Sequence, residues 1–325
     1  MGHYLLRRVL YALPVLFGIN LITFALFFMV NSPDDMARMQ LGQKHVTEAL
    51  ITQWKEEHGY HLPLFYNPVA EGISKVTETL FYQKSVRLFT FDFGMSDGGR
   101  DISFDISHRM WPSLAIALPV LFLSMFADIV LAMCMAFFRT TWVDISGVVL
   151  CIILMSISAL FYIIGGQYLF GKILRLAPIS GYESGIDSVR FLLMPVLVAV
   201  LGGLGAGARW YRTLFLEEIA KDYARTARAK GLSEQAVLFG HVLKNAMLPI
   251  LTGVVVLIPS LFMGSLVLES FFGVPGLGSY MIDAIQQQDF AIVRAMVFLG
   301  SVLYLVGLIL TDISYTLVDP RVRLT

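Results

Sequence analysis

Three acidic residues, Asp128, Glu269 and Asp312, lie within long apolar stretches of the 325-residue chain. An acidic side chain at the centre of a membrane helix costs roughly 2.5–3.5 kcal/mol on insertion scales, so such a residue is expected to face protein or water. We interpret Asp128 and Asp312 as polar residues of a solute pathway or as structural polar groups, and both alternatives stay open. Glu269 is expected near an outer interface, and Asp312 near an inner end, where Arg321 is a possible partner.

Other patterns that carry chemistry are absent from the sequence. It contains neither a Walker A sequence nor His-Glu-x-x-His, so we predict no catalytic residues and no nucleotide site. His45, His58 and His61 are close together, but Gly59 interrupts any helix between them, and we expect solvated histidines, not a metal site. We predict no cofactor. Energy for any transport must come from another chain or from an ion gradient.

A glycine-rich run, Gly202 to Ala208, contains one match to the dinucleotide-binding pattern Gly-x-Gly-x-x-Ala. The run lies inside an apolar segment without a preceding strand. We therefore interpret it as small-residue packing, which lets one helix approach a neighbour closely.

The composition indicates that lipid is the solvent of this chain. Hydrophobic residues make up 57% of it and charged residues 15%, whereas soluble domains are typically about 45–50% apolar and about a quarter charged. The formal net charge is zero, and we predict no nucleic-acid partner.

The apolar segments predict an all-α integral membrane fold with six transmembrane helices. Six stretches are long enough to cross about 30 Å of hydrocarbon. They cover approximately 9–30, 111–138, 146–170, 191–208, 248–270 and 291–315. The first is too long for a signal peptide and has no cleavage site after it, so we expect an uncleaved span.

The basic residues predict the orientation of these spans. Twelve Lys and Arg residues fall at the termini and in the loops of one side, and four in the short loops of the other, which places both termini in the cytoplasm. The predicted parts are a first helix (1–30), an exterior, periplasmic segment (31–110), a transmembrane domain (111–315) with a cytoplasmic loop at 209–247, and a cytoplasmic tail (316–325). Within the exterior segment, Val46, Leu50, Ile51 and Trp54 predict one apolar helix face that ends at Gly59.

The cytoplasmic loop predicts an amphipathic helix over roughly 216–230. Its apolar stripe comprises Phe215, Leu216, Ile219, Ala220, Tyr223, Ala224 and Ala227. Gly231 can end this helix and Ser233 can cap the next one. Two interpretations fit this periodicity equally well. The helix lies on the lipid surface, or it inserts into a groove of a partner protein.

Several motifs resemble type I ABC-importer permeases, closest to the B-type subunit of dipeptide, oligopeptide and nickel importers, known as binding-protein-dependent transport system inner-membrane components. The family signature is Glu-Ala-Ala, two residues, Gly, nine residues, then Ile-x-Leu-Pro. Thr226-Ala227-Arg228 and Gly231 match its first part, whereas His241 and Lys244 replace Ile and Pro, as in the peptide-importer branch.

Motifs elsewhere in the chain resemble the same branch. They are Leu6-Arg7-Arg8, the element 91–96 (Phe-Asp-Phe-Gly-Met-Ser), the loop 271–278 (Phe-Phe-Gly-Val-Pro-Gly-Leu-Gly) and Asp319-Pro320-Arg321. The element 91–96 departs from the branch pattern at Phe91, which stands in place of a glycine.

The resemblance implies a type I ABC-importer permease fold in a bacterial inner membrane, with no ATPase site of its own. It also implies four kinds of partner: a homologous C-type permease subunit, two ATP-binding subunits, a periplasmic or lipid-anchored substrate-binding protein, and a peptide-like substrate. The implied ATPase-coupling residues are Tyr223, Thr226, Ala227, Arg228, Ala229, Lys230, Gly231 and Leu232. Two other hypotheses are a secondary transporter that couples to protons through Asp128 and Asp312, and a membrane enzyme or interaction subunit.

Overall fold

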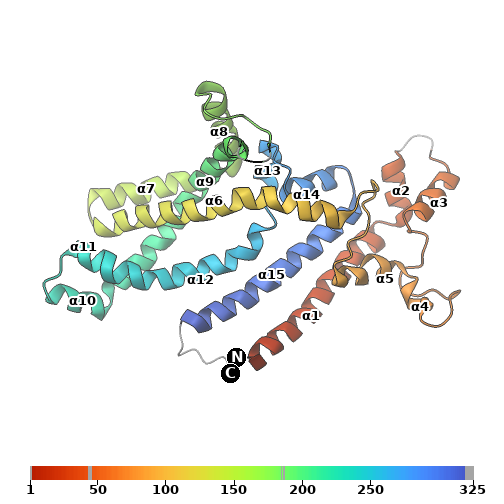
Figure 1. The fold of residues 1–325 in the computed structure, drawn as a ribbon, viewed down its shortest axis with the longest axis horizontal. Coiled ribbons are helices and arrows are strands. Elements are labelled where there is room, and N and C mark those ends of the chain that lie inside the picture. The colour runs from red at the N-terminus through yellow and green to blue at the C-terminus, as the bar shows by residue number, and fades with distance from the viewer. Residues whose placement is uncertain (1, 43–45, 184, 186, 319–325) are drawn as a thin grey trace. The chain divides into compact units, whose positions relative to one another are not determined.

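The described part of the protein is helical throughout. A computed structural model describes residues 2–318 except residues 43–45, 184 and 186 (Figure 1). Within these residues the only pairing of extended backbone is one antiparallel bridge, between Met95 and Asp101. The predicted all-α class is confirmed.

Five described helices are long and apolar enough to cross a membrane. They are α1 (Gly2–Ala25) with η1 (Leu26–Val30), α6 (Ile102–Phe137), α9 (Ser188–Ala220), α11 (Glu234–Val237) with η4 (Leu238–Val242) and α12 (Leu243–Leu261), and α15 (Phe290–Val318). A helix suits lipid because it satisfies its own backbone N–H and C=O groups. The fourth predicted span, 191–208, lies within α9, which begins at Ser188 and continues to Ala220.

The third predicted span, 146–170, is two helices and not one. α7 (Trp142–Ser156) meets α8 (Ala159–Gly166) and η3 (Gln167–Ile173) at a bend of 89°. Ile157 and Ser158 between them are extended, and the Ser156 hydroxyl donates to the Ile152 carbonyl at 2.8 Å, a bond that competes with helix continuation. Counted as one broken span, this pair brings the total to the six that the sequence predicts.

The fifth predicted span, 248–270, ends early. α12 stops at Leu261, and α13 (Leu266–Phe272) is a separate short helix. Gly264 between them has a φ of +67°, a conformation that favours glycine and that an α-helix does not contain. Ser265 then starts α13 by accepting a hydrogen bond from the Leu268 N–H at 3.4 Å.

Glu269 is therefore part of α13 and not of the fifth span. Its side chain is 1% exposed. One carboxylate oxygen accepts from the Ser265 N–H and the other from the Ser279 N–H, each at 3.1 Å. Gly264 and Gly276 leave room for it, because a Cβ at either position would collide with its oxygens.

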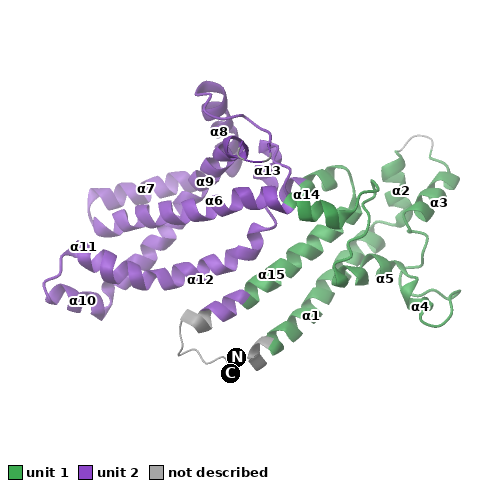
Figure 2. Cartoon of the chain, in the orientation of Figure 1, with its two compact units in different colours: residues 1–109, 280–309, 324–325 green, residues 110–279, 310–323 purple. Residues whose placement is uncertain are grey.

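The chain divides into two compact units (Figure 2). Unit 1 comprises residues 1–109, 280–309 and 324–325, and unit 2 comprises 110–279 and 310–323. In unit 1 the first span packs against α2 (Pro33–Leu41), α3 (Glu48–Glu57) and α5 (Leu80–Lys84). The unit also contains α4 (Ser74–Thr77), η2 (Val86–Thr90), the beginning of α6, most of α14 (Leu277–Gln286) and the first part of α15.

The predicted helix of the segment 31–110 is confirmed as α3. Ile51 and Trp54 are buried against Phe24 of α1, whereas Leu50 is 44% exposed and does not belong to the buried face. Gly59 follows the helix with a φ of +68°. His58 is half-buried and contacts the Asp97 carbonyl through Nε2 at 3.2 Å, so it is not the solvated histidine that we expected. His45 lies outside the described residues.

Two aspartates of unit 1, the buried Asp289 and the partly buried Asp97, each accept a hydrogen bond from the backbone at or beside the other. Asp289 accepts from the Asp97 N–H and, at the start of α15, from the Ile292 N–H, both at 3.1 Å. Asp97 in turn accepts from the Phe290 N–H at 3.1 Å and from the Tyr60 hydroxyl at 3.2 Å. Burial, with the nearby Asp289 carboxylate, raises the pKa of Asp97. These bonds tie the segment 31–110 to the beginning of the last span.

Replacing Asp289 by alanine is expected to destabilise unit 1 by about 2 kcal/mol, because two N–H groups lose their acceptor and one of them caps a helix. The measurement is the thermal midpoint of unfolding in detergent. Asp289→Asn keeps an acceptor oxygen and should lose less. Asp283→Ala, at an exposed residue of α14, is the control and should leave the midpoint unchanged.

Candidate functional site

The predicted amphipathic helix 216–230 is interrupted at Lys221. α9 ends at Ala220, Lys221 is extended with φ −70° and ψ 154°, and α10 (Asp222–Ala229) starts a new helix. Glu218 stabilises this corner: its Oε1 accepts from the Lys221 ammonium at 2.5 Å and its Oε2 from the Tyr223 hydroxyl at 2.6 Å. Burial and this last bond raise the pKa of Tyr223 to about 12, so its hydroxyl remains a donor at neutral pH. The prediction of one continuous helix is therefore wrong.

The apolar stripe of this region faces the core of unit 2. Ala224 and Ala227 of α10 are at most 5% exposed. They belong to a cluster formed with α9, α11 and η4, whose other buried members include Phe215, Ile219, Val237, Leu238 and Val242. The exposed face of α10 consists of small and polar side chains: Asp222, Arg225, Thr226 and Ala229, followed by Lys230.

The end of α10 follows the predicted pattern. Gly231 has a φ of +80°, its N–H donates to the Arg228 carbonyl at 2.9 Å, and the Leu232 N–H donates to the Ala227 carbonyl at 3.3 Å. These bonds satisfy the last carbonyls of the helix. Ser233 then caps α11 by accepting from the Ala236 N–H at 3.3 Å, as predicted.

A carboxylate that the sequence analysis did not single out, Glu234, connects α10 with the turn between α6 and α7. Arg228 binds it through two bonds of 2.9 and 3.0 Å, and Arg139 donates to it at 2.9 Å. The bond to Glu234 raises the pKa of Arg228 above its usual value. Because these side chains are about one-third exposed, the network positions α10 more than it stabilises the fold.

A second ion pair connects α7 with α9. Arg212 donates to both carboxylate oxygens of Asp144, at 2.7 and 2.8 Å, and the Thr140 N–H adds a bond of 3.2 Å. Arg139 and Arg212 are two of the twelve basic residues that predict the orientation of the spans. Their partners lie 95 and 68 positions away, respectively, a separation at which no local pattern signals a pair.

The structure brings the eight predicted coupling residues together, with different accessibility. Tyr223, Thr226, Ala227, Arg228 and Ala229 belong to α10, and Lys230, Gly231 and Leu232 follow it. Ala227 is buried, and Tyr223 and Arg228 are partly buried in bonds within unit 2. Thr226, Ala229, Lys230, Gly231 and Leu232 are exposed, and they are the members of the set that a partner can touch.

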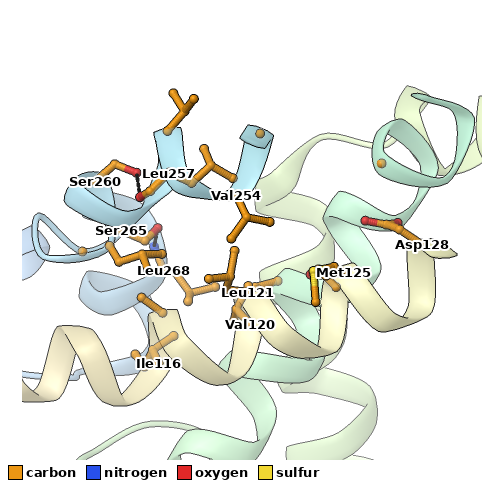
Figure 3. A pocket seen from close by; sticks show the side chains of 18 of the residues that line it. Ile116, Val120, Leu121, Met125, Asp128, Val254, Leu257, Ser260, Ser265 and Leu268 are labelled. Carbon is orange, nitrogen blue, oxygen red and sulfur yellow. Dashed lines mark hydrogen bonds between the residues drawn. The ribbon is translucent and has the colours of Figure 1, made fainter. Parts of the chain in front are cut away.

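Asp128 lies in α6 and lines a cavity of about 710 Å³ in unit 2 (Figure 3). The residue is 6% exposed, and its Oδ1 has no hydrogen-bond partner among the described residues. Asp312, in α15, does not line this cavity, so the described cavity does not bring the two predicted acids together. Arg321, the possible partner of Asp312, lies outside the described residues.

The glycine-rich run packs as predicted. A Cβ on Gly205 would come within 2.6 Å of the Cys151 carbonyl oxygen of α7, and one on Gly207 would collide with the Asp128 carboxyl group of α6. The absence of side chains at these two positions lets α9 approach both neighbours.

Comparisons with known proteins match nearly the whole chain. Residues 128–324, more than half of it, match the family described as the binding-protein-dependent transport system inner membrane component, and residues 1–84 match the N-terminal region of such membrane components. A putative peptide transport system permease protein of Brucella abortus is 31% identical over 98% of both chains.

Two further relatives cover almost all of the chain. A dipeptide transport system permease protein of Bacillus subtilis is 28% identical over 100% of this chain and 99% of its own. A glutathione transport system permease protein of Salmonella paratyphi A is 27% identical over 99% of both.

Replacing Gly207 by alanine is expected to destabilise the protein by about 1–3 kcal/mol, because the new methyl group must displace α9 or the Asp128 side chain. Gly203→Ala, in the same helix, is the matched control: a Cβ there meets nothing within 4 Å, and alanine favours the helix. The thermal midpoints of the two purified variants provide the comparison. Equal midpoints would contradict the close approach of α9 to α6.

Proposed function

Because the chain belongs to the family of binding-protein-dependent transport system inner membrane components, we propose that it carries peptide-like solutes across the membrane, with α10 as its contact to an ATPase. Membership makes it a multi-pass inner-membrane permease of an ABC importer, whose ATP hydrolysis takes place on partner subunits. Family membership does not support the alternative of a proton-coupled secondary transporter. The peptide-like substrate is proposed from relatives described as peptide, dipeptide and glutathione permeases.

The proposed complex contains this chain, a homologous C-type permease, two ATP-binding subunits and an exterior substrate-binding protein. We place both termini and the loop 209–247 in the cytoplasm and residues 31–110 outside. The support is the distribution of basic residues in the short loops. Asp128 and Asp312 are proposed as polar residues of the pathway.

The exposed face of α10, which we call the docking face, is the feature on which the coupling proposal rests. The exposed residues Arg225, Thr226, Ala229 and Lys230 project from a helix whose opposite side is buried in unit 2. The ATPase therefore contacts a small and polar face with basic side chains, and not the apolar stripe that the periodicity suggested.

Side-chain hydrogen bonds connect α10 directly to other helices of unit 2. Tyr223 is bonded to Glu218 at the end of α9, and Arg228 is bonded to Glu234, which also holds Arg139 beside the end of α6. A displacement of α10 by the ATPases would shift these helix ends together. Such a rigid connection couples nucleotide state to the arrangement of the spans.

Replacing Gly231 by tyrosine is expected to uncouple ATP hydrolysis from uptake, because the new ring would project from the docking face. Uptake per ATP hydrolysed in proteoliposomes should fall about tenfold, within typical coupling energies of about 1–3 kcal/mol. Gly231→Asn is a comparison variant with a smaller side chain. Asparagine tolerates positive φ, so this variant separates the effect of the bulky ring from that of backbone strain. Gly240→Tyr, at another exposed glycine of the loop, is the control. Normal coupling in Gly231→Tyr would count against the docking face.

The orientation is tested by cysteine labelling in a variant without Cys134 and Cys151. Val69→Cys, at a residue that is 91% exposed, should react with an impermeant maleimide added to intact spheroplasts. Lys230→Cys should react only after the membrane is permeabilised. The opposite pattern would reverse the topology.

A further inference from the structure

The cavity of unit 2 is lined mostly by apolar side chains. It lies between α6, α9, α12 and the start of α13, and the labelled side chains of Figure 3 that project into it include Val120, Leu121, Val254, Leu257 and Leu268. Two acidic residues, Asp128 and Glu269, are among those that line it. Its volume of about 710 Å³ falls within the range of about 300–1,000 Å³ that is usual for small-molecule sites.

The two acidic residues of the cavity differ in how their charge is compensated. Both oxygens of Glu269 accept backbone N–H groups. Asp128 has the nearby Ala208 N–H, and its buried Oδ1 has no partner in the part of the chain that the structure describes. Within the described residues no Lys, Arg or His nitrogen lies within 4.0 Å of it, and Arg212 of the facing helix α9 is engaged by Asp144. The Asp128 carboxylate is therefore a buried acceptor with room for a donor.

Two glycines leave space for two side chains that line this cavity, Asp128 and Trp210. Gly207 of α9 leaves space for the Asp128 carboxyl group, and Gly253 of α12 leaves space for the Trp210 ring, whose atoms would lie 3.3 Å from a Cβ at that position. Both Asp128 and Trp210 line the cavity. A carboxylate and an indole in an apolar enclosure are the groups that attract an organic cation.

We propose that this cavity binds the ammonium group of a solute with an apolar body, with Asp128 as the counter-ion. The solute class is a primary ammonium compound carrying an alkyl or aryl group, which includes the amino terminus of a short apolar peptide. Pairing satisfies the orphaned oxygen, and the apolar walls cover the remainder of the solute. The role of this site in transport depends on the proposed function of the protein. The binding of the ammonium compound does not depend on it.

Binding is tested with octylammonium as the probe, on the full-length protein purified with its co-purifying subunits in nanodiscs, without ATP. Equilibrium dialysis should show that octylammonium binds to Asp128→Asn about 30-fold more weakly than to the wild type. This factor is the lower end of the range of affinity losses that follow removal of one partner of a buried charge pair. Glu217→Gln removes an exposed carboxylate of α9 that does not line the cavity, and this variant should bind like the wild type. Octanol, which lacks the charge, should not distinguish the three proteins. Equal octylammonium binding to wild type and Asp128→Asn would overturn the proposal.

A second measurement needs no variant. Dicyclohexylcarbodiimide modifies carboxyl groups in apolar surroundings, and mass spectrometry can follow Asp128 and Asp312 in the same sample. Octylammonium, but not octanol, should slow modification of Asp128 and leave Asp312 unchanged. Equal protection of both acids, or none, would contradict a site at Asp128. Failure of peptide uptake with this protection intact would refute the transport proposal alone.

Discussion

The burial of Ala224 and Ala227 against α11 and η4 determines which side of α10 faces outward, and the proposed coupling depends on this contact. Two small side chains allow the helix to lie close to the core of unit 2. Their burial leaves Arg225, Thr226 and Lys230 accessible. Because apolar burial is non-directional, it cannot set the position of α10 alone, and the charged bonds at Glu218 and Glu234 supply that precision.

Buried acids of unit 2 are accommodated in three different ways. Glu269 accepts backbone N–H groups where two loops meet α13, and Asp144 pairs with the guanidinium of Arg212. Asp128 has one nearby backbone N–H, from Ala208, but its Oδ1 has no partner among the described residues, and it lines a cavity. A buried carboxylate whose oxygens are bonded to groups of the same chain needs no other partner. An acid that remains uncompensated points to a partner from outside the chain, since a buried polar group without a partner is costly.

Small residues allow these close approaches in α9. Gly205 lies against the backbone of α7 and Gly207 against the Asp128 side chain of α6. Helices in lipid gain little from the hydrophobic effect when they associate, so close packing carries more of the stabilisation. Gly207, which lets α9 approach α6 closely, therefore also leaves the space that the Asp128 carboxyl group occupies.

The sequence by itself determined the features that depend on local composition. Apolar length predicted the spans, the glycine at 231 and the serine at 233 predicted a helix end and a helix start, and separated motifs predicted the family. Only the tertiary structure decided the break at Lys221, the bend at Ile157, the inward direction of the apolar stripe, and the bond between Glu234 and Arg139. The physical reason is that periodicity reports which residues avoid water. It does not report whether core, lipid or partner covers them, nor which distant charge will satisfy a buried carboxylate.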